Sequence, residues 1–270
     1  MKGKLCCATA AVLIGSAVIG FAGPYSIHDH TLVKVDWSYQ SVVSIGNIPS
    51  GVDSIEFSTD GFIYGVDTLN DTLVRIDPLN GQAETIGALG VDLEWVTDLD
   101  EDDLGQLWLL EGITGQLYSI DTTTGAATLR CEAGNPEIFG LAIDDGRFFT
   151  TDYPPDPPDP GCGLEYVSSY AFYLEKGPDG WIHGLSFYPF GFQYTVYVFF
   201  RVDPTTGIHE VLGEFGPNAG DYWGLTFDPT EQPPPEAGIP ATGRAGTVIL
   251  IALLAITGVA ILTRVWTLPG

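Results

Sequence analysis

Short runs in which apolar and polar residues alternate recur along this chain, and two stretches are nearly the same phrase. Residues 31–46 read TLVKVDWSYQSVVSIG, and residues 72–87 read TLVRIDPLNGQAETIG. In each phrase, an Asp in the sixth position separates two runs of alternating residues. Alternation with a period of two predicts β-strands, and a polar break between two such runs predicts a turn. Each phrase is therefore expected to form two antiparallel strands.

The phrase returns at a nearly constant interval. Its Asp residues, spaced by 41, 44 and 82 positions, are Asp36, Asp77, Asp121 and Asp203. A degenerate copy is expected in the last interval, and the stretch from Leu164 fits it, with Ser168 in the place of Asp. A second hairpin-like phrase precedes the first and starts near residues 53, 97, 139, 183 and 223. One unit thus holds four short strands in roughly 40 residues, which is typical of a β-propeller blade.

The predicted domain, residues 24–230, does not begin and end at the boundaries of whole units. This domain starts with the second half of a unit, residues 31–48, and ends with the first half of another, residues 222–229. Joining the two halves completes a blade and leaves no open sheet edge. We therefore predict an all-β fold, a β-propeller of about five four-stranded blades closed by its N- and C-terminal strands. A solenoid or a sandwich of the same strands is the alternative.

These phrases resemble the repeats of bacterial secreted β-propellers of the WD, NHL and quinoprotein-like types. They lack the signature of any one of those families. The resemblance implies the fold and leaves the activity open, because propellers host many functions.

The N-terminus has the layout of a secretory signal peptide. Lys2 and Lys4 precede an apolar run from Leu5 to Ala22, and small residues close that run. This order of basic, apolar and small residues predicts a signal peptide over residues 1–23. A membrane anchor that is retained is the alternative.

The C-terminus predicts a membrane attachment. A Pro-rich linker with a short motif occupies residues 231–243, an apolar segment follows at residues 244–264, and residues 265–270 form a tail. The apolar segment is long enough to cross a bilayer as a transmembrane helix. The domain is therefore expected outside the cytoplasmic membrane, anchored at the bacterial cell surface or membrane.

The motif before that segment resembles two bacterial sorting signals. Its residues are Ile239, Pro240, Thr242 and Gly243. They are similar to the Leu-Pro-x-Thr-Gly signal of sortases, and Ile-Pro before a span is also similar to the Ile-Pro-Thr-Leu tails of exosortase systems. Either resemblance implies a sorting enzyme as a partner, whereas a plain one-span anchor is the alternative.

The charge balance is strongly acidic. The chain has 10 Lys and Arg against 35 Asp and Glu, a formal net charge of −25. Such a chain repels phosphate backbones, which argues against nucleic acid as a partner. It suits cations, although solubility at the cell surface is the simpler explanation.

Two cysteines belong to the predicted exported domain, namely Cys131 and Cys162. In an exported protein such a pair favours a disulfide over a metal site. Closing a loop of about 30 residues would contribute about 3–4 kcal/mol in the chain-entropy model.

One acidic stretch is a candidate metal site. Asp98, Asp100 and Asp102 alternate as in acidic calcium loops, where hard oxygen ligands surround the ion. Asp103 and Leu109 stand where such a loop places Gly and Glu. Ca²⁺ is the one cofactor that the sequence indicates, bound by these aspartates. The alternative is that they are exposed carboxylates of a turn.

Aromatic residues recur just before the first predicted strand of every unit except the first, which has Val52 there. They are Trp95, Phe139, Trp181, Tyr222 and Trp223, and His183 lies beside them. We expect these residues at one mouth of a central channel, where aromatic faces could stack on sugar rings. Packing between blades as core is the alternative.

No catalytic residue can be named from the sequence. It contains no Gly-x-Ser-x-Gly elbow and no phosphate-binding glycine loop. The main hypothesis is a non-catalytic surface module that binds or adheres to an extracellular glycan or protein. The alternative is a secreted hydrolase or lyase that acts on polysaccharide through paired carboxylates.

Overall fold

A computed structural model describes most of the predicted domain. The described residues are 23–37, 41–93, 97–133, 138–152, 162–167, 171–190, 194–215 and 222–232. They belong to a compact unit, Met1–Pro235, and a second unit, Glu236–Gly270, lies wholly outside them. Also outside them are residues 1–22 of the predicted signal peptide, the sorting motif and the predicted transmembrane segment at 244–264. Among the described residues, no helix is long and apolar enough to span a membrane.

The described chain forms five β-sheets. Sheet A has the order β19 (Tyr222–Thr226), β1 (Tyr25–His28), β2 (Thr31–Val35), β3 (Val42–Asn47). Sheet B has the order β4 (Val52–Phe57), β5 (Ile63–Asp67), β6 (Thr72–Ile76), β7 (Ala83–Ala88). Sheet C has the order β8 (Thr97–Glu101), β9 (Leu107–Glu111), β10 (Gln116–Ile120), β11 (Ala127–Glu132). Sheet D consists of β12 (Ile138–Asp144), β13 (Arg147–Asp152) and β14 (Leu164–Tyr166). Sheet E has the order β15 (Tyr173–Lys176), β16 (Ile182–Phe190), β17 (Tyr194–Val202), β18 (His209–Phe215).

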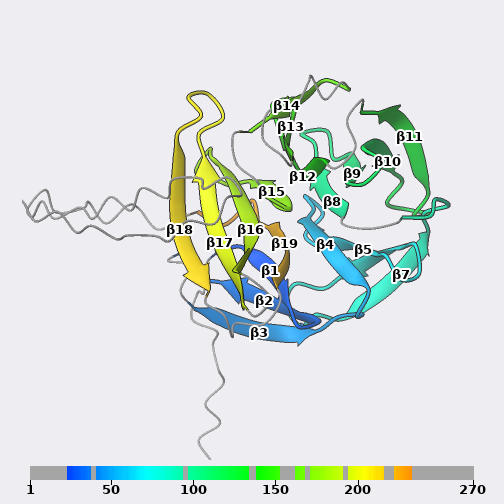
Figure 1. Cartoon of the computed structure of the whole chain (residues 1–270). Coiled ribbons are helices and arrows are strands. Elements are labelled where there is room, and N and C mark those ends of the chain that lie inside the picture. Colours follow the sequence, from blue (N-terminus) through cyan, green and yellow to red (C-terminus); the bar gives the residue numbers. More distant parts are fainter. Residues whose placement is uncertain are drawn as a thin grey trace, which may run out of the picture. The chain divides into compact units, whose positions relative to one another are not determined.

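One strand of each sheet lies at the centre of a ring. These inner strands contact one another in the circular order β19, β4, β8, β12, β15 and back to β19. Figure 1 shows the same five strands gathered at the centre, with β3, β7, β11 and β18 at the rim. The five-bladed, all-β propeller predicted from the repeat is therefore confirmed.

The repeated Asp explains the repeated phrase. Asp77, Asp121 and Asp203 each follow the third strand of a sheet, and each accepts a hydrogen bond from the backbone nitrogen two positions on, at 2.8 Å. This is the Asx-type turn that a short carboxylate favours. The phrase is thus the third strand, the turn and the fourth strand of a blade.

Closure of the ring by the two chain ends is also confirmed, with one correction. Sheet A combines β19 from the C-terminal side with β1, β2 and β3 from the N-terminal side. The direct partner of β19 is β1, with Tyr25 opposite Thr226 and His28 opposite Tyr222. The prediction missed β1 because this strand precedes the repeated phrase. The shared blade is therefore divided one strand to three, not two to two.

The fourth and fifth sheets depart further from the prediction. The stretch from Leu164 is not one degenerate unit, since β14 belongs to sheet D, where it runs parallel to β13, and β15 is the inner strand of sheet E. The phrase near residue 183 forms β16, which is hydrogen-bonded on one side to β15 and on the other to β17. A strand paired on both sides cannot be the innermost strand of its blade, so the alignment of this unit was wrong.

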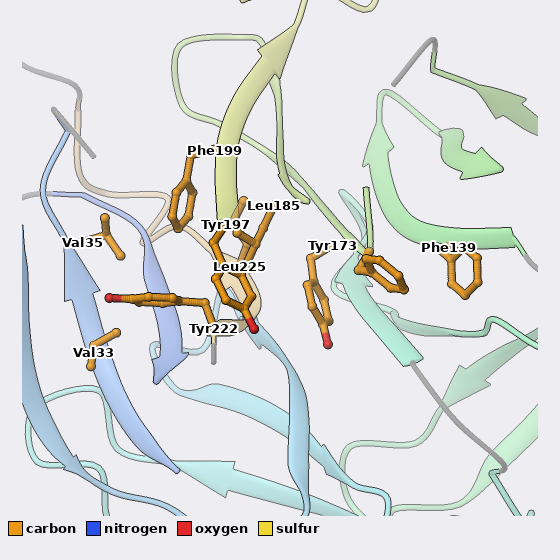
Figure 2. Packing of buried hydrophobic residues seen from close by; sticks show 10 residues of the cluster. Val33, Val35, Phe139, Tyr173, Leu185, Tyr197, Phe199, Tyr222 and Leu225 are labelled. Atoms are coloured by element: carbon orange, nitrogen blue, oxygen red, sulfur yellow. The ribbon is translucent and has the colours of Figure 1, made fainter. Parts of the chain in front are cut away.

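Apolar side chains fill the space between neighbouring sheets. Val33 and Tyr222 of sheet A pack with Leu185 and Phe199 of sheet E in one buried cluster, which Figure 2 shows from close by. The predicted disulfide is confirmed and joins sheets C and D at their outer parts. It links Cys131 on β11 with Cys162 just before β14, with Cα atoms 5.9 Å apart.

Candidate cation site at the centre of the ring

Acidic side chains from three inner strands meet at the centre of the propeller. Glu56 of β4, Asp100 of β8 and Glu175 of β15 each place one carboxylate oxygen within 4.8 Å of the other two. Their exposed fractions are 4%, 2% and 5%. We call these three residues the carboxylate cluster. Buried carboxyl groups this close are rare in proteins unless they are paired, protonated or bound to a cation.

Strand alternation places these groups at the centre. On β4, Ile55 and Phe57 enter the apolar cluster that also contains Tyr25, so Glu56 between them points away from it. On β15, Leu174 packs with residues of sheet D, which leaves Glu175 on the opposite side. Glu56 and Glu175 therefore point away from the apolar layers of their blades and toward the axis of the ring.

A fourth buried carboxylate, Asp98, has a different role. Its Oδ2 accepts hydrogen bonds from the backbone nitrogens of Leu141 at 2.6 Å and Leu174 at 3.0 Å. Its Oδ1 accepts a third from Leu99 at 3.1 Å. Asp98 thus ties β8 to the inner strands of sheets D and E.

The carboxylate cluster itself is only partly satisfied by hydrogen bonds. Asp100 accepts them from the backbone nitrogens of Ile143 and Glu101, and Glu56 accepts one from the Thr226 hydroxyl at 3.0 Å. By contrast, the buried Oε2 of Glu175 has no hydrogen-bond partner within the described part of the chain.

Tyr173, two residues before Glu175 on the same strand, is buried in the apolar cluster between sheets. Burial raises the pKa of its phenol most, the charges of Asp53 and Asp98 raise it further, and a hydrogen bond with the Gly224 backbone opposes the rise. Within the carboxylate cluster, the buried oxygen without a hydrogen-bond partner among the described residues is therefore Oε2 of Glu175. A buried polar atom of this kind calls for a proton, a water molecule or an ion beside it.

Burial also controls the protonation of the cluster. It raises the pKa of Glu56 to about 8, against hydrogen bonds with the Glu175 carboxyl group, the Thr226 hydroxyl and the Phe57 nitrogen. Burial likewise raises the pKa values of Asp100 and Glu175 well above their ordinary range, and the charge of Glu56 raises both further. No Lys, Arg or His forms an ion pair with these three groups in the described ranges. The cluster must therefore hold protons or a cation.

The chemistry of the donors fits a hard divalent cation. Ca²⁺ takes 6–8 oxygen ligands and Mg²⁺ takes six, mostly from carboxylates, carbonyls and water. Glu56, Asp100 and Glu175 would supply three carboxylate ligands from three different blades. Such a cation would neutralise two of the three charges and stabilise the ionised forms.

The predicted calcium loop does not form as one site. Asp98 and Asp100 are buried, whereas Asp102 accepts hydrogen bonds from Leu104 nitrogen at 2.9 Å, Gln106 nitrogen at 3.0 Å and Trp108 Nε1 at 2.9 Å. Asp102 thus fixes the turn between β8 and β9. Asp98 and Asp100 lie on one face of β8, whereas Asp102 lies beyond the end of that strand. Asp102 is a half-buried turn carboxylate, and the neighbouring Asp103 is exposed.

Sequence reasoning missed Glu56 and Glu175. Glu56 stands between two apolar residues in the stretch SIEF, and Glu175 follows a leucine in the stretch YLEK. A single acidic residue inside an inner strand is the signal that would have found Glu56. Glu175 was hidden because the inner strand of its blade was assigned to residue 183 and beyond.

The predicted aromatic residues do not form one collar in the described structure. Trp95 lies outside the described residues. Phe139 and Tyr222 are 8% and 3% exposed and belong to the apolar cluster of Figure 2, as the alternative of core packing expects. Trp223 is half-buried against two apolar clusters. Trp181 precedes β16, not an inner strand, and the Arg201 guanidinium lies 4.4 Å from its ring centre.

His183 forms a small polar network with Asp179 and Arg201, which we call the clasp. Its Nε2 lies 2.9 Å from Asp179 Oδ1, and the other oxygen of Asp179 accepts a hydrogen bond from Arg201 at 2.9 Å. Burial lowers the pKa of His183, although Asp179 opposes this. Burial disfavours the Asp179 carboxylate, yet the contacts with His183 and Arg201 outweigh it and hold its pKa at about 2. The clasp stabilises the turn between β15 and β16.

Comparisons with known proteins give one family model and several distant structural likenesses. A family model described as a domain of unknown function, DUF4394, matches residues 26–142. The chain is similar to a gluconolactonase from Xanthomonas campestris, with 13% identity and a TM-score of 0.46 over 76% of this chain and 80% of that one. It is similar to a chain of a nidogen–laminin complex, with 11% identity and a TM-score of 0.45 over 75% and 97% of the two chains. It is also similar to virginiamycin B lyase from Staphylococcus aureus, with 13% identity and a TM-score of 0.36 over 73% of this chain and 71% of that one.

No curated protein matches the sequence. The fold of this chain rests on its own strand order, and the likenesses above do not bear on its activity.

Proposed function

We propose that this protein is an exported β-propeller that binds a divalent cation, Ca²⁺ in the first place, at the centre of its ring. The observation that carries the proposal is the carboxylate cluster of Glu56, Asp100 and Glu175, with the unsatisfied Oε2 of Glu175 inside it. A cation there ties three blades together from within. It stabilises a surface-displayed module for an extracellular glycan or protein ligand.

The burial of the cluster favours binding over catalysis. A general acid or base must come within hydrogen-bonding distance of the substrate proton that it moves. Each of the three carboxylates is at most 5% exposed, and each faces the other two. A cation held there acts as a structural ion.

The alternative, a hydrolase or lyase acting on polysaccharide, has one specific observation in its favour. Retaining glycosidases use two carboxyl groups about 5–5.5 Å apart. The oxygens of the cluster lie within 4.8 Å of one another, which is close to that separation. Release of reducing sugar from a polysaccharide panel, lost in Glu175→Gln, would support the enzyme and overturn the binding module.

The location of the protein is part of the proposal. Its support is the basic and apolar order of residues 1–22, the apolar segment at 244–264, and the Cys131–Cys162 disulfide. Disulfides persist in oxidising compartments outside the cytoplasm. The transmembrane segment and the motif at residues 239–243 then imply the membrane and a sorting enzyme as partners.

Calorimetric titration tests the cation site. Chelator-treated full-length chain is titrated with Ca²⁺, Mg²⁺ and Mn²⁺. We expect one cation per chain, binding lost in Glu175→Gln, and binding retained in Asp103→Asn, which removes an exposed carboxylate from the same acidic stretch. Absence of binding, or equal binding by Glu175→Gln and the wild-type chain, would refute the proposal.

A further inference from the structure

Glu231 holds the N-terminal end of the propeller. Its Oε2 accepts a hydrogen bond from the backbone nitrogen of Gly23 at 3.1 Å, and its Oε1 pairs with Lys34 Nζ. Gly23 and Glu231 are 208 positions apart, so this carboxylate joins the segment before β1 to the segment after β19.

The surroundings of Glu231 hold more negative than positive charge. Lys34 also donates a hydrogen bond to the Tyr25 hydroxyl at 3.2 Å. Burial raises the pKa of Tyr25, Lys34 opposes this, and the charges of Glu231 and Asp228 add to the rise. At Tyr25, two negative charges therefore act against the one positive charge of Lys34.

Gly23 is fixed in a conformation that suits glycine. Its φ is +151°, and a Cβ there would lie 1.9 Å from the carbonyl oxygen of Val35. The next residue is held too, because Val35 nitrogen donates to Pro24 oxygen at 2.8 Å. The nitrogen of Gly23 is therefore placed accurately against Glu231.

The sequence ahead of Gly23 is Gly20-Phe21-Ala22. Small residues one and three positions before a bond, at the end of an apolar run, form the pattern at which signal peptides are cut. We propose that the Ala22–Gly23 bond is the processing site and that the α-ammonium group released on Gly23 forms an ion pair with Glu231.

The chemistry is a simple hydrolysis. Water adds its oxygen to the carbonyl carbon of Ala22, the C–N bond breaks, and the nitrogen of Gly23 leaves as an amine that takes up a proton. An amide N–H that already donates to a carboxylate thereby becomes a charged ammonium donor, so the attraction between opposite charges is added to the hydrogen bond. Cutting therefore strengthens a contact between the two chain segments that meet in the shared blade.

This inference rests on the exported location proposed above, and it moves the predicted end of the signal peptide from residue 23 to residue 22. N-terminal sequencing of the full chain, expressed with its own N-terminus in a bacterial host, should give Gly23 as the first residue. A cut at another bond would refute the inference and leave export intact. An uncut chain would also refute the inference and would favour the retained membrane anchor, which still places the domain outside.

A second experiment isolates the ion pair. Two chains are prepared by proteolytic removal of a leader, one running from Gly23 to Gly270 and one from Ala22 to Gly270. The Ala22 chain should melt about 2–4 °C lower, because its charged amine is displaced from Glu231.

In Glu231→Gln this difference between the two chains should vanish, whereas the exposed control Glu84→Gln should preserve it. The measured quantity is the difference in melting temperature between the Gly23 chain and the Ala22 chain of each variant. The loss of the Lys34 contact in Glu231→Gln affects both chains and therefore cancels in this difference. Equal melting of the two wild-type chains would overturn the ion pair.

Discussion

The hydroxyl group of Thr226 on β19 donates a hydrogen bond to the Glu56 carboxylate on β4 at 3.0 Å, across 170 positions of sequence. The same oxygen accepts a hydrogen bond from the backbone nitrogen of Phe57 at 2.7 Å. Thr226 belongs to the strand that closes the ring, and Glu56 belongs to the carboxylate cluster. One side chain therefore couples ring closure to the proposed cation site.

Replacing Thr226 by Val tests this coupling. The variant keeps the shape of the side chain and leaves the buried Phe57 nitrogen without its acceptor, which should lower the free energy of unfolding by about 1–3 kcal/mol. Thr226→Ser keeps the hydroxyl and should lose less. Chemical denaturation of the full chain measures both. A Val variant as stable as the Ser variant would show that the hydroxyl group does not matter.

The fold class and the number of blades could be predicted from the sequence, because each repeat carries the same turn-forming Asp. Asp77, Asp121 and Asp203 mark the same turn in three blades, so the strand count per unit could be read from their spacing. The spacing does not predict the strands of a blade that departs from the repeat. Near Leu164 the chain makes a parallel pairing, which no short-range pattern predicts, and the inner strand of sheet E is only four residues long.

The site was less accessible to sequence reasoning, because it is assembled from residues far apart. Glu56, Asp100 and Glu175 come from three blades, and no spacing rule connects them. The predicted aspartate triplet contained one member of the cluster, Asp100, for the wrong reason. Local alternation could place each carboxylate on an inner strand, but only the ring brings them within 4.8 Å.

The carboxylate cluster predicts an unusual response to pH when no divalent cation is bound. The pKa of Glu56 is raised to about 8 from an ordinary value of 4.5, so the folded chain binds more protons than the unfolded chain between these values. The stabilisation is fully present below about pH 4.5 and is lost as pH rises toward about 8, by roughly 1.4 kcal/mol per pH unit for one such group. The melting temperature measured in the presence of a chelator should therefore fall as the pH rises over this range.

Adding Ca²⁺ should remove most of that fall, because the ion stabilises the ionised carboxylates and displaces their protons. The apparent affinity for Ca²⁺ should accordingly rise with pH. Glu175→Gln should melt at the same temperature with and without Ca²⁺. Chelated wild-type chain whose melting temperature is constant between about pH 5 and about pH 8 would contradict the assignment.

The clasp of His183 and Asp179 predicts the opposite response in acid. The pKa of His183 is lowered by burial, so its contribution to stability is present above its ordinary value of 6.5 and is lost as pH falls. The pKa of Asp179 is held at about 2 against an ordinary 3.8, and its contribution is lost as pH falls through that interval. Asp179→Asn should therefore destabilise the chain at neutral pH and reduce the acid sensitivity of its melting. Glu165→Gln, in an exposed pair with Arg147, should cost about 0–1 kcal/mol.

The disulfide between Cys131 and Cys162 should be detected in the secreted protein. Mass spectrometry of unreduced peptides should show the two cysteines linked, and alkylation without reduction should label neither. The double variant Cys131→Ser, Cys162→Ser should lose about 3–4 kcal/mol, because the unfolded chain gains the freedom of an open loop. Two alkylatable thiols in the secreted form would refute the pairing.

The aromatic residues provide the sharpest contrast between a core and a binding surface. Phe139 is 8% exposed, its ring centre lies 5.0 Å from that of Phe172, and it belongs to the cluster between sheets. Phe139→Ala should therefore lower the free energy of unfolding by about 3–5 kcal/mol. Trp181 is half-buried and makes its described ring contact with Arg201, so Trp181→Ala should cost clearly less.

Glycan-array binding separates the two roles further. Trp181 keeps part of its surface open beside a cationic side chain, which is an arrangement that can stack on a sugar ring. If Trp181 contributes to ligand binding, Trp181→Ala loses array signal while its melting temperature stays near that of the wild-type chain, and Trp181→Phe retains part of the signal. A Trp181→Ala chain that melts as low as Phe139→Ala would place Trp181 in the core and exclude it from the binding surface.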